Sequence, residues 1–242
     1  MYTLPTAYRR DSLLGALGAA LMLVGDLCLS AVPVSSGDSG LFFREAYLSG
    51  AYPSWRLPLL LVTGLLGMAL CTFAIRVFYA QIRPEHKRFR FAAKLGGAVH
   101  LTSAGVLHFM IGSLADWTST LAPLLGREQT AALIQAQYER VMPAALIAYA
   151  GMVLLILVSS WAALTKKTIL PRRMFLLHLL PWQLALVLIP DLRQTLGAAP
   201  STWDFVLSQC SGNTALLIWM LANTVWASGH ISHEKSQESE EL

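Results

Sequence analysis

Six apolar runs, separated by short polar segments, set the organisation of the whole chain. A helix rises ~1.5 Å per residue, so about 20 apolar residues are needed to cross the hydrocarbon core of a bilayer. Runs of this kind predict membrane-spanning helices rather than buried strands, because they are too long for strands. The predicted spans cover residues 12–32, 57–82, 92–117, 144–164, 174–192 and 213–228.

The composition supports an all-α integral membrane protein. Of the 242 residues, 55% are hydrophobic and only 13% are charged, whereas soluble domains carry about 25% charged residues. We therefore predict a single bundle of six transmembrane helices over residues 12–228. A polar segment, 1–11, precedes it, and a polar tail, 229–242, is predicted to be disordered.

The segments between the spans carry local signals of their own. Residues 35–55 are turn-forming at both ends and predict a short helix at the membrane interface, capped by Asp38 or Ser39. Residues 127–141 have helical periodicity, and Pro143 predicts a bend before the next span. Pro181 and Pro190 predict interruptions of the fifth span, and residues 193–212 are expected to form an outer loop. The apolar residues assigned to the short interfacial helix are Leu41, Phe42, Tyr47 and Leu48.

The distribution of Lys and Arg predicts the orientation. Twelve basic residues fall in the segments on one side of the predicted spans and five fall on the other, with Arg76 near the richer side. Positive residues accumulate in cytoplasmic loops, so both termini are predicted to be cytoplasmic. We expect a multi-pass protein of the bacterial cytoplasmic membrane.

The third run carries polar and small residues at intervals of four. Residues four apart lie on one face of a helix, and ionisable groups within a span normally face the bundle interior or a wet cavity. The spacing therefore predicts a polar cavity lined by the third span, in the outer half of the bundle. The residues of this stripe are Gly96, His100, Ala104, His108, Gly112 and Asp116.

Asp26 and His108 are the candidates for catalysis as well as for binding. Asp26 lies roughly 9 Å inside the outer end of the first span, counted at ~1.5 Å per residue. A carboxylate buried there needs a partner, and His108 lies at a similar depth on another span. The pair fits either a structural hydrogen bond, worth ~0.6 kcal/mol in membranes, or an acid–base pair.

Four other residues complete the candidate ligand-binding set. Asp191 and Asn213 fall in the same outer half, although the nearness of Asp191 to the surface also fits a solvated side chain. Trp219 and Asn223 share one face of the sixth span with Trp226, which fits either a pocket wall or a packed face. The expected ligand is a small amphiphilic or lipidic molecule.

No cofactor or metal ion is expected. His100 and His178 are the candidate cofactor ligands, as an axial pair for haem, but their predicted depths differ by about 6 Å. The cysteines lack the paired spacing of a zinc site, and a disulfide between Cys28 and Cys210 is left open. The basic loops are explained by topology, so the expected partner is the lipid bilayer and not nucleic acid.

Several segments resemble one known family. They are GDLCL in the first span, RLPLLLVTGLLG in the second, the glycine-rich start of the third, KKTILPRR before the fifth and SGNTALLIW in the sixth. Together they resemble a domain-of-unknown-function family of bacterial polytopic membrane proteins. The resemblance implies the membrane topology and no particular activity.

Three classes of function remain open on this basis. The leading one is a binding protein or transporter-like module for the amphiphile. The second is an intramembrane enzyme that uses Asp26 and His108 on such a molecule. The third is an accessory membrane subunit whose polar groups only specify packing. No inverted repeat is visible in the sequence, which counts against alternating access.

Overall fold

The computed structural model describes residues 4–35, 38, 44–50 and 52–240, and this part of the chain is built from helices. The described residues contain no β-strand beyond one isolated bridge between Ile82 and Thr168. The predicted all-α fold is confirmed. The elements are α1 (Leu4–Ser30), α2 (Glu45–Leu48), α3 (Arg56–Gln81), α4 (Lys87–Leu125), α5 (Arg127–Leu164), the 3-10 helix η1 (Arg172–Leu177), α6 (Leu179–Thr195), α7 (Thr202–Gln209) and α8 (Ser211–Glu240).

Within the described residues, five helical segments are long and apolar enough to cross a membrane. They are α1 from Thr6 onward, α3, α4, α5, and η1 together with α6. Helices α7 and α8 meet at an angle of 60° and form a sixth candidate if the bent pair is one span. The six predicted apolar runs thus correspond to five or six candidate spans.

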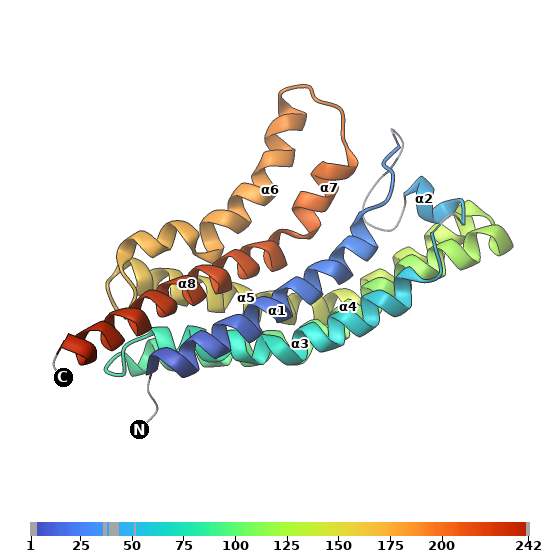
Figure 1. The fold of residues 1–242 in the computed structure, drawn as a ribbon. Helices are drawn as coiled ribbons and strands as arrows, with labels where there is room; N and C mark the ends of the chain where they lie inside the picture. Colours follow the sequence, from blue (N-terminus) through green and yellow to red (C-terminus); the bar gives the residue numbers. More distant parts are fainter. Residues whose placement is uncertain (1–3, 36–37, 39–43, 51, 241–242) are drawn as a thin grey trace.

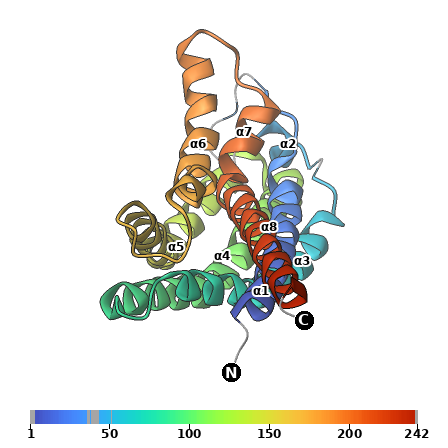
Figure 2. The ribbon, with the colours of Figure 1, turned by 60° about the vertical axis from the view of Figure 1, so that its left-hand side comes forward.

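The helices are arranged as an elongated bundle (Figure 1). Helix α1 packs along α3 and α8, and α4 packs along α5. Both views show α6 and α7 rising away from the other helices as an open hairpin (Figures 1 and 2). Both chain termini lie at one end of the bundle, called here the terminal end, and the α4–α5 turn at Gly126 lies at the other, the distal end.

Glycines allow the closest helix contacts. At the crossing of α1 and α3, a Cβ atom built on Gly18 would lie 2.9 Å from the carbonyl oxygen of Gly67, and one on Gly67 would lie 2.8 Å from that of Gly18. Gly96 of α4 and Gly151 of α5 show the same reciprocal contact, at 2.8 and 2.9 Å. A side chain at any of the four would push backbones apart, so these glycines fix the helices that surround the site.

Several helices are longer than the spans predicted from their apolar runs. Helix α1 begins at Leu4, so most of the polar segment 1–11 belongs to a helix. Helix α4 continues beyond Trp117 to Leu125, and α5 passes through Pro143 without a break. A proline removes one backbone hydrogen bond, which a helix tolerates when a neighbouring helix packs along it, as α4 does here.

The second half of the chain also departs from the prediction. Pro181 lies in the first turn of α6, where its missing N–H group leaves no hydrogen bond unmade, so the interruption of the fifth span occurs at His178 instead. The expected outer loop 193–212 contains α7, and α8 extends to Glu240 through the tail predicted to be disordered.

The short helix after the first span is present as α2. Arg44 is the N-cap residue, and its side chain makes no capping hydrogen bond. Asp38 Oδ1 instead accepts a hydrogen bond from the Glu45 N–H at 2.8 Å. The predicted role of Asp38 at the start of this helix is therefore close to the observed one. Tyr47 and Leu48 belong to α2, whereas Ser39, Leu41 and Phe42 lie outside the described residues.

Candidate ligand-binding cavity

A cavity of about 300 Å³ lies inside the bundle, between α1, α3, α4, α5, α6 and the α7–α8 turn. Most of its wall consists of Leu, Ile, Met, Ala and Phe side chains. A minority of polar residues face the same space. They are Asp26, His100, His108, Tyr149, Gln183, Ser208, Gln209, Ser211 and Asn213.

Asp26 lies at the centre of the polar part of the wall. Its Oδ2 accepts a hydrogen bond from Asn213 Nδ2 at 2.7 Å. Its Oδ1 lies 3.7 Å from His108 Nε2, which exceeds a normal hydrogen-bond length. The side chains of Asp26 and His108 are 14% and 18% exposed. The structure thus brings three predicted residues together, with Asn213 as the direct partner of the carboxylate. We call these three the polar corner.

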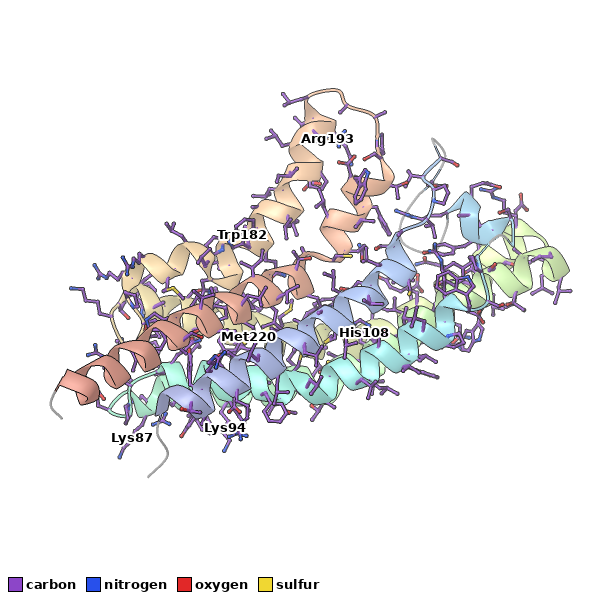
Figure 3. The ribbon with its side chains drawn as sticks, viewed as in Figure 1. Lys87, Lys94, His108, Trp182, Arg193 and Met220 are labelled. Carbon is purple, nitrogen blue, oxygen red and sulfur yellow. The ribbon has the colours of Figure 1, made fainter. Side chains whose placement is uncertain are left out.

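Small residues make room for the polar corner. A Cβ atom on Gly64 of α3 would lie 3.7 Å from His108 Cβ and Nδ1, so the imidazole of α4 packs directly against the α3 backbone. Gly25, next to Asp26, faces Thr63 in the same way. His108 therefore lies in the interior of the bundle, whereas Lys87 and Lys94 lie near the terminal end (Figure 3).

The bend between α7 and α8 positions the third member of the polar corner. The two helices are separated by Cys210 alone, and residues on both sides of it line the cavity. Asn213 is the third residue of α8, and its amide reaches Asp26 of α1. Interrupted helices within membranes are tolerated where they line a cavity, and transporters often bind their substrates at such breaks.

Five of the six residues of the predicted stripe on α4 face inward, whereas Asp116 is half-buried and does not line the cavity. Gly96, Ala104 and Gly112 are buried, and His100 and His108 line the cavity. His100 Nδ1 lies 3.3 Å from the carbonyl oxygen of Ala148 on α5, so part of its hydrogen-bonding capacity is used there.

The structure places the other three candidate residues outside the cavity. Asp191 is exposed on α6, which agrees with the alternative prediction that its side chain is solvated. Trp219 and Asn223 are buried in the hydrophobic core instead. Asn223 Oδ1 accepts hydrogen bonds from the Tyr8 hydroxyl and from Gln81 Nε2, the latter at 2.9 Å. Asn223 Nδ2 donates to the Trp219 carbonyl oxygen at 2.7 Å. We call this set the Asn223 network.

The candidate haem ligands occupy different environments. His178 caps the start of α6, where its Nδ1 accepts from the Leu180 N–H at 3.4 Å and lies 3.1 Å from Ser160 Oγ. Its ring stacks on Phe175 and meets the edge of Trp219 at 4.8 Å between centroids. His178 does not line the cavity that contains His100. The structure therefore does not assemble the pair.

Metal and disulfide chemistry can be judged from the described residues. Within them, no three or more His, Cys, Asp or Glu side chains are grouped so as to hold a metal ion. All three cysteines are free and buried, so the disulfide between Cys28 and Cys210 that the sequence left open is not formed. Cys210 Sγ lies 3.5 Å from Ser30 Oγ instead.

Some lining residues were missed by the sequence analysis. Gln183 is an amide within an apolar run, which is the same signal that identified Asn213, and it could have been found in this way. Tyr149 has no such signal, because aromatic residues are common in spans. Ser208 and Gln209 lie in a segment that was expected to be a loop, and only the fold of α7 brings them to the cavity.

Comparison with known proteins gives one match. A family model described as a family of unknown function, DUF6796, matches residues 2–202. This range includes Asp26 and His108 but ends before Asn213. No curated protein and no solved structure matches the chain.

Proposed function

Because the chain belongs to the DUF6796 family, whose function is unknown, we propose a function from the cavity itself: a bacterial inner-membrane protein that binds or moves a small amphiphilic molecule. The long apolar helices are consistent with a membrane location. The excess of basic residues near the terminal end supports cytoplasmic termini.

The observation that carries the proposal is the two-sided character of the cavity wall. The polar corner lies on one part of it, and side chains such as Leu101, Leu107 and Met152 form the rest. Binding sites for small molecules are typically apolar clefts with a few placed polar groups that orient the ligand. A ligand with a polar head and an apolar chain satisfies both parts of the wall.

The size of the cavity limits the ligand. Its volume of about 300 Å³ lies at the small end of the range for small-molecule sites, roughly 300–1,000 Å³. A two-chain phospholipid is several times larger than this. The proposal therefore favours a single-chain amphiphile, or one that places only its head and the first part of its chain inside.

The charge of the polar corner narrows the head group. Asp26 is the only acidic residue in the cavity wall, and no Lys or Arg is among the described residues that line it. An anionic head group would approach the carboxylate without a cation to balance it, which is costly in a site of low dielectric constant. An amine or a hydroxyl head group, which can donate hydrogen bonds to Asp26, suits the site better.

The enzyme hypothesis remains as a second candidate because of one distance. A gap of 3.7 Å between His108 Nε2 and Asp26 Oδ1 is too long for a hydrogen bond, and such gaps can close around a substrate. On this alternative the same amphiphile is chemically altered. The amphiphile is extracted and its mass is measured before and after incubation with the protein. An unchanged mass indicates binding, and a changed mass indicates turnover.

Three probes of equal chain length test the proposal: decylamine, decanol and decanoate. Each is added to the purified protein, and bound probe is counted by native mass spectrometry. We expect the amine and the alcohol to bind several-fold better than the carboxylate. Asp26→Asn and His108→Gln should reduce this binding by roughly tenfold, the effect of losing one buried polar contact of ~1.4 kcal/mol.

Asp191→Asn is the matched control, because it removes a carboxylate of the same type from an exposed position on α6. Binding should be unchanged in this variant. If Asp26→Asn and Asp191→Asn bind all three probes as the unmodified protein does, the polar corner is not a ligand site.

A further inference from the structure

A second pocket lies at the terminal end, away from the cavity. It is open, has a volume of about 610 Å³, and lies between the α3–α4 loop, the segment from the end of α5 to the start of η1, and Trp226 of α8. Four of its lining residues are basic: Arg83, Lys166, Arg172 and Arg173. We call it the basic pocket.

Backbone hydrogen bonds hold the two loops of the basic pocket together. Ile82 and Thr168 form an antiparallel bridge. The Arg83 N–H donates to the Lys167 carbonyl oxygen at 2.9 Å, and the Ile169 N–H donates to that of Gln81 at 2.9 Å. The basic residues of two loops more than 80 positions apart are thereby fixed on one rim.

Side-chain and backbone geometry direct the basic residues to this rim. Arg83 Nε donates to the Thr168 carbonyl oxygen at 3.2 Å, which orients its guanidinium across the junction of the loops. Lys166 has a φ of 59°, a left-handed conformation that non-glycine residues seldom adopt. Local strain of this kind is found more often at functional sites than elsewhere.

No carboxylate balances the charge of the basic pocket among the side chains that the structure describes. All four basic side chains are exposed. None of them forms a salt bridge with a carboxylate in the part of the chain that the structure describes, and no described acidic residue lines the pocket. Four cations around one opening repel each other, so an anion bound between them relieves the repulsion.

We propose that the basic pocket binds a phosphate group carried by an anionic molecule, and that the usual source is the head group of an anionic phospholipid. Arg binds phosphate through paired N–H donors. Ile169, Pro171 and Trp226 provide an apolar wall beside the cations. Basic pockets at the cytoplasmic ends of membrane helices bind lipid head groups in this way.

A count of positive residues does not by itself account for this arrangement. Topology requires only that Lys and Arg lie on one side of the membrane. Lys87 and Arg88 fulfil that requirement from the first turn of α4, where both are exposed and neither lines the pocket. They therefore provide a matched pair of basic residues outside the proposed site.

The test compares two double variants that lose the same charge. Phosphatidylglycerol, or phosphatidylcholine with the same acyl chains, is titrated into three full-length proteins. These are the unmodified protein, the pocket variant Arg172→Gln/Arg173→Gln and the α4 variant Lys87→Gln/Arg88→Gln. Native mass spectrometry counts the bound lipids. We expect a preference for phosphatidylglycerol that falls roughly tenfold in the pocket variant and persists in the α4 variant. In parallel, the thermal unfolding of each protein is measured with inorganic phosphate and with pyrophosphate, which tests whether a soluble molecule supplies the phosphate group.

Each outcome decides the proposal. Equal binding of the two lipids with no stabilisation by phosphate or pyrophosphate would overturn it. So would an equal loss of phosphatidylglycerol in both double variants, because that result reflects overall charge. Stabilisation by pyrophosphate that only the pocket variant loses would support the site and identify a soluble phosphate as the source.

Discussion

The polar corner and the Asn223 network contain similar residues but differ in how their polar groups are satisfied. Both include an asparagine of α8, ten positions apart in the sequence. In the Asn223 network, two donors converge on Asn223 Oδ1 and its own amide donates to a backbone carbonyl oxygen. In the polar corner, the Asp26 carboxylate accepts one hydrogen bond, from Asn213, and the His108 imidazole beside it stays at 3.7 Å.

This difference separates two uses of buried polarity. Hydrogen bonds among buried side chains rigidify a core and specify its packing, and in the Asn223 network only the Trp219 indole N–H is without a partner among the described residues. A polar group that faces open space keeps hydrogen-bonding capacity for another molecule. The Asn223 network joins α1, α3 and α8 near the terminal end, whereas the polar corner faces a cavity. We therefore assign structure to the first and binding to the second.

The largest expected effect is on the reporter fusions that test topology, because each loop lies on one side of the membrane or on the other. Positive residues near Lys87 and Lys167 predict that the terminal end is cytoplasmic. Reporter fusions after Arg90 and Lys167 should therefore read as cytoplasmic, and fusions after Gly50, Arg127 and Ala199 as external. Alkaline phosphatase activity and green fluorescence provide the two opposite readouts.

One reproducible reversal among these five fusions would contradict the six-span topology. It would also remove the assignment of the polar corner to the outer half and of the Asn223 network to the inner half. Agreement at all five sites would place the basic pocket on the cytoplasmic surface.

The next effect is on stability, and it compares the two asparagines directly. Asn223→Leu leaves the Tyr8 hydroxyl and the Gln81 amide without their acceptor, and each stranded donor costs about 1–3 kcal/mol. We expect a total loss of about 2–6 kcal/mol for the two donors. Asn213→Leu should cost less than about 1 kcal/mol, because Asp26 faces a cavity that water can enter.

Equilibrium unfolding in mixed micelles measures both variants, and probe binding is recorded on the same samples. Asn213→Leu should weaken decylamine binding while Asn223→Leu, below its unfolding transition, should preserve it. Equal loss of stability in the two variants would show that the distinction between a satisfied network and an open corner is wrong.

The smallest effect is the coupling within the polar corner. At 3.7 Å, Asp26 and His108 should couple by only about 0.5 kcal/mol, near the average for polar pairs in membranes. Asp26 and Asn213, joined at 2.7 Å, should couple more strongly than this, by up to about 1 kcal/mol. Double-mutant cycles on the unfolding free energy, with Asp26→Asn paired to His108→Gln or to Asn213→Leu, provide both values.

A stronger coupling to His108 than to Asn213 would reverse this order. It would indicate that the imidazole and the carboxylate act as one unit in the free protein, as the enzyme hypothesis requires.

Much of the architecture could be predicted from the sequence because it depends on local patterns. The apolar runs located the spans, and the four-residue spacing in α4 identified its inward face correctly. Gly18 and Gly67, two small residues within the first and second apolar runs, form the close contact between α1 and α3. These features follow from helix geometry and residue size alone.

The partners of each polar residue could not be predicted in the same way. Periodicity shows which face a residue occupies on its own helix, but not which helix packs against that face. Asn213 and Asn223 gave the same signal, an amide within an apolar run. Only the packing of α1 against α8 gives Asn213 a carboxylate as its partner and Asn223 a tyrosine. The bend at Cys210 has no proline to mark it, whereas Pro143 lies inside a helix that continues through it.

The lengths of α4 and α5 have a consequence at the distal end. With 39 and 38 residues, each helix is ~57 Å long, whereas a bilayer with its head groups is about 40–45 Å thick. At the average tilt of about 20°, the hairpin would still extend roughly 10 Å into water beyond Gly126's side of the membrane. The residues around Gly126 do not line the cavity, so a peptide epitope inserted at Gly126 should be recognised by an antibody from outside while the polar corner remains intact.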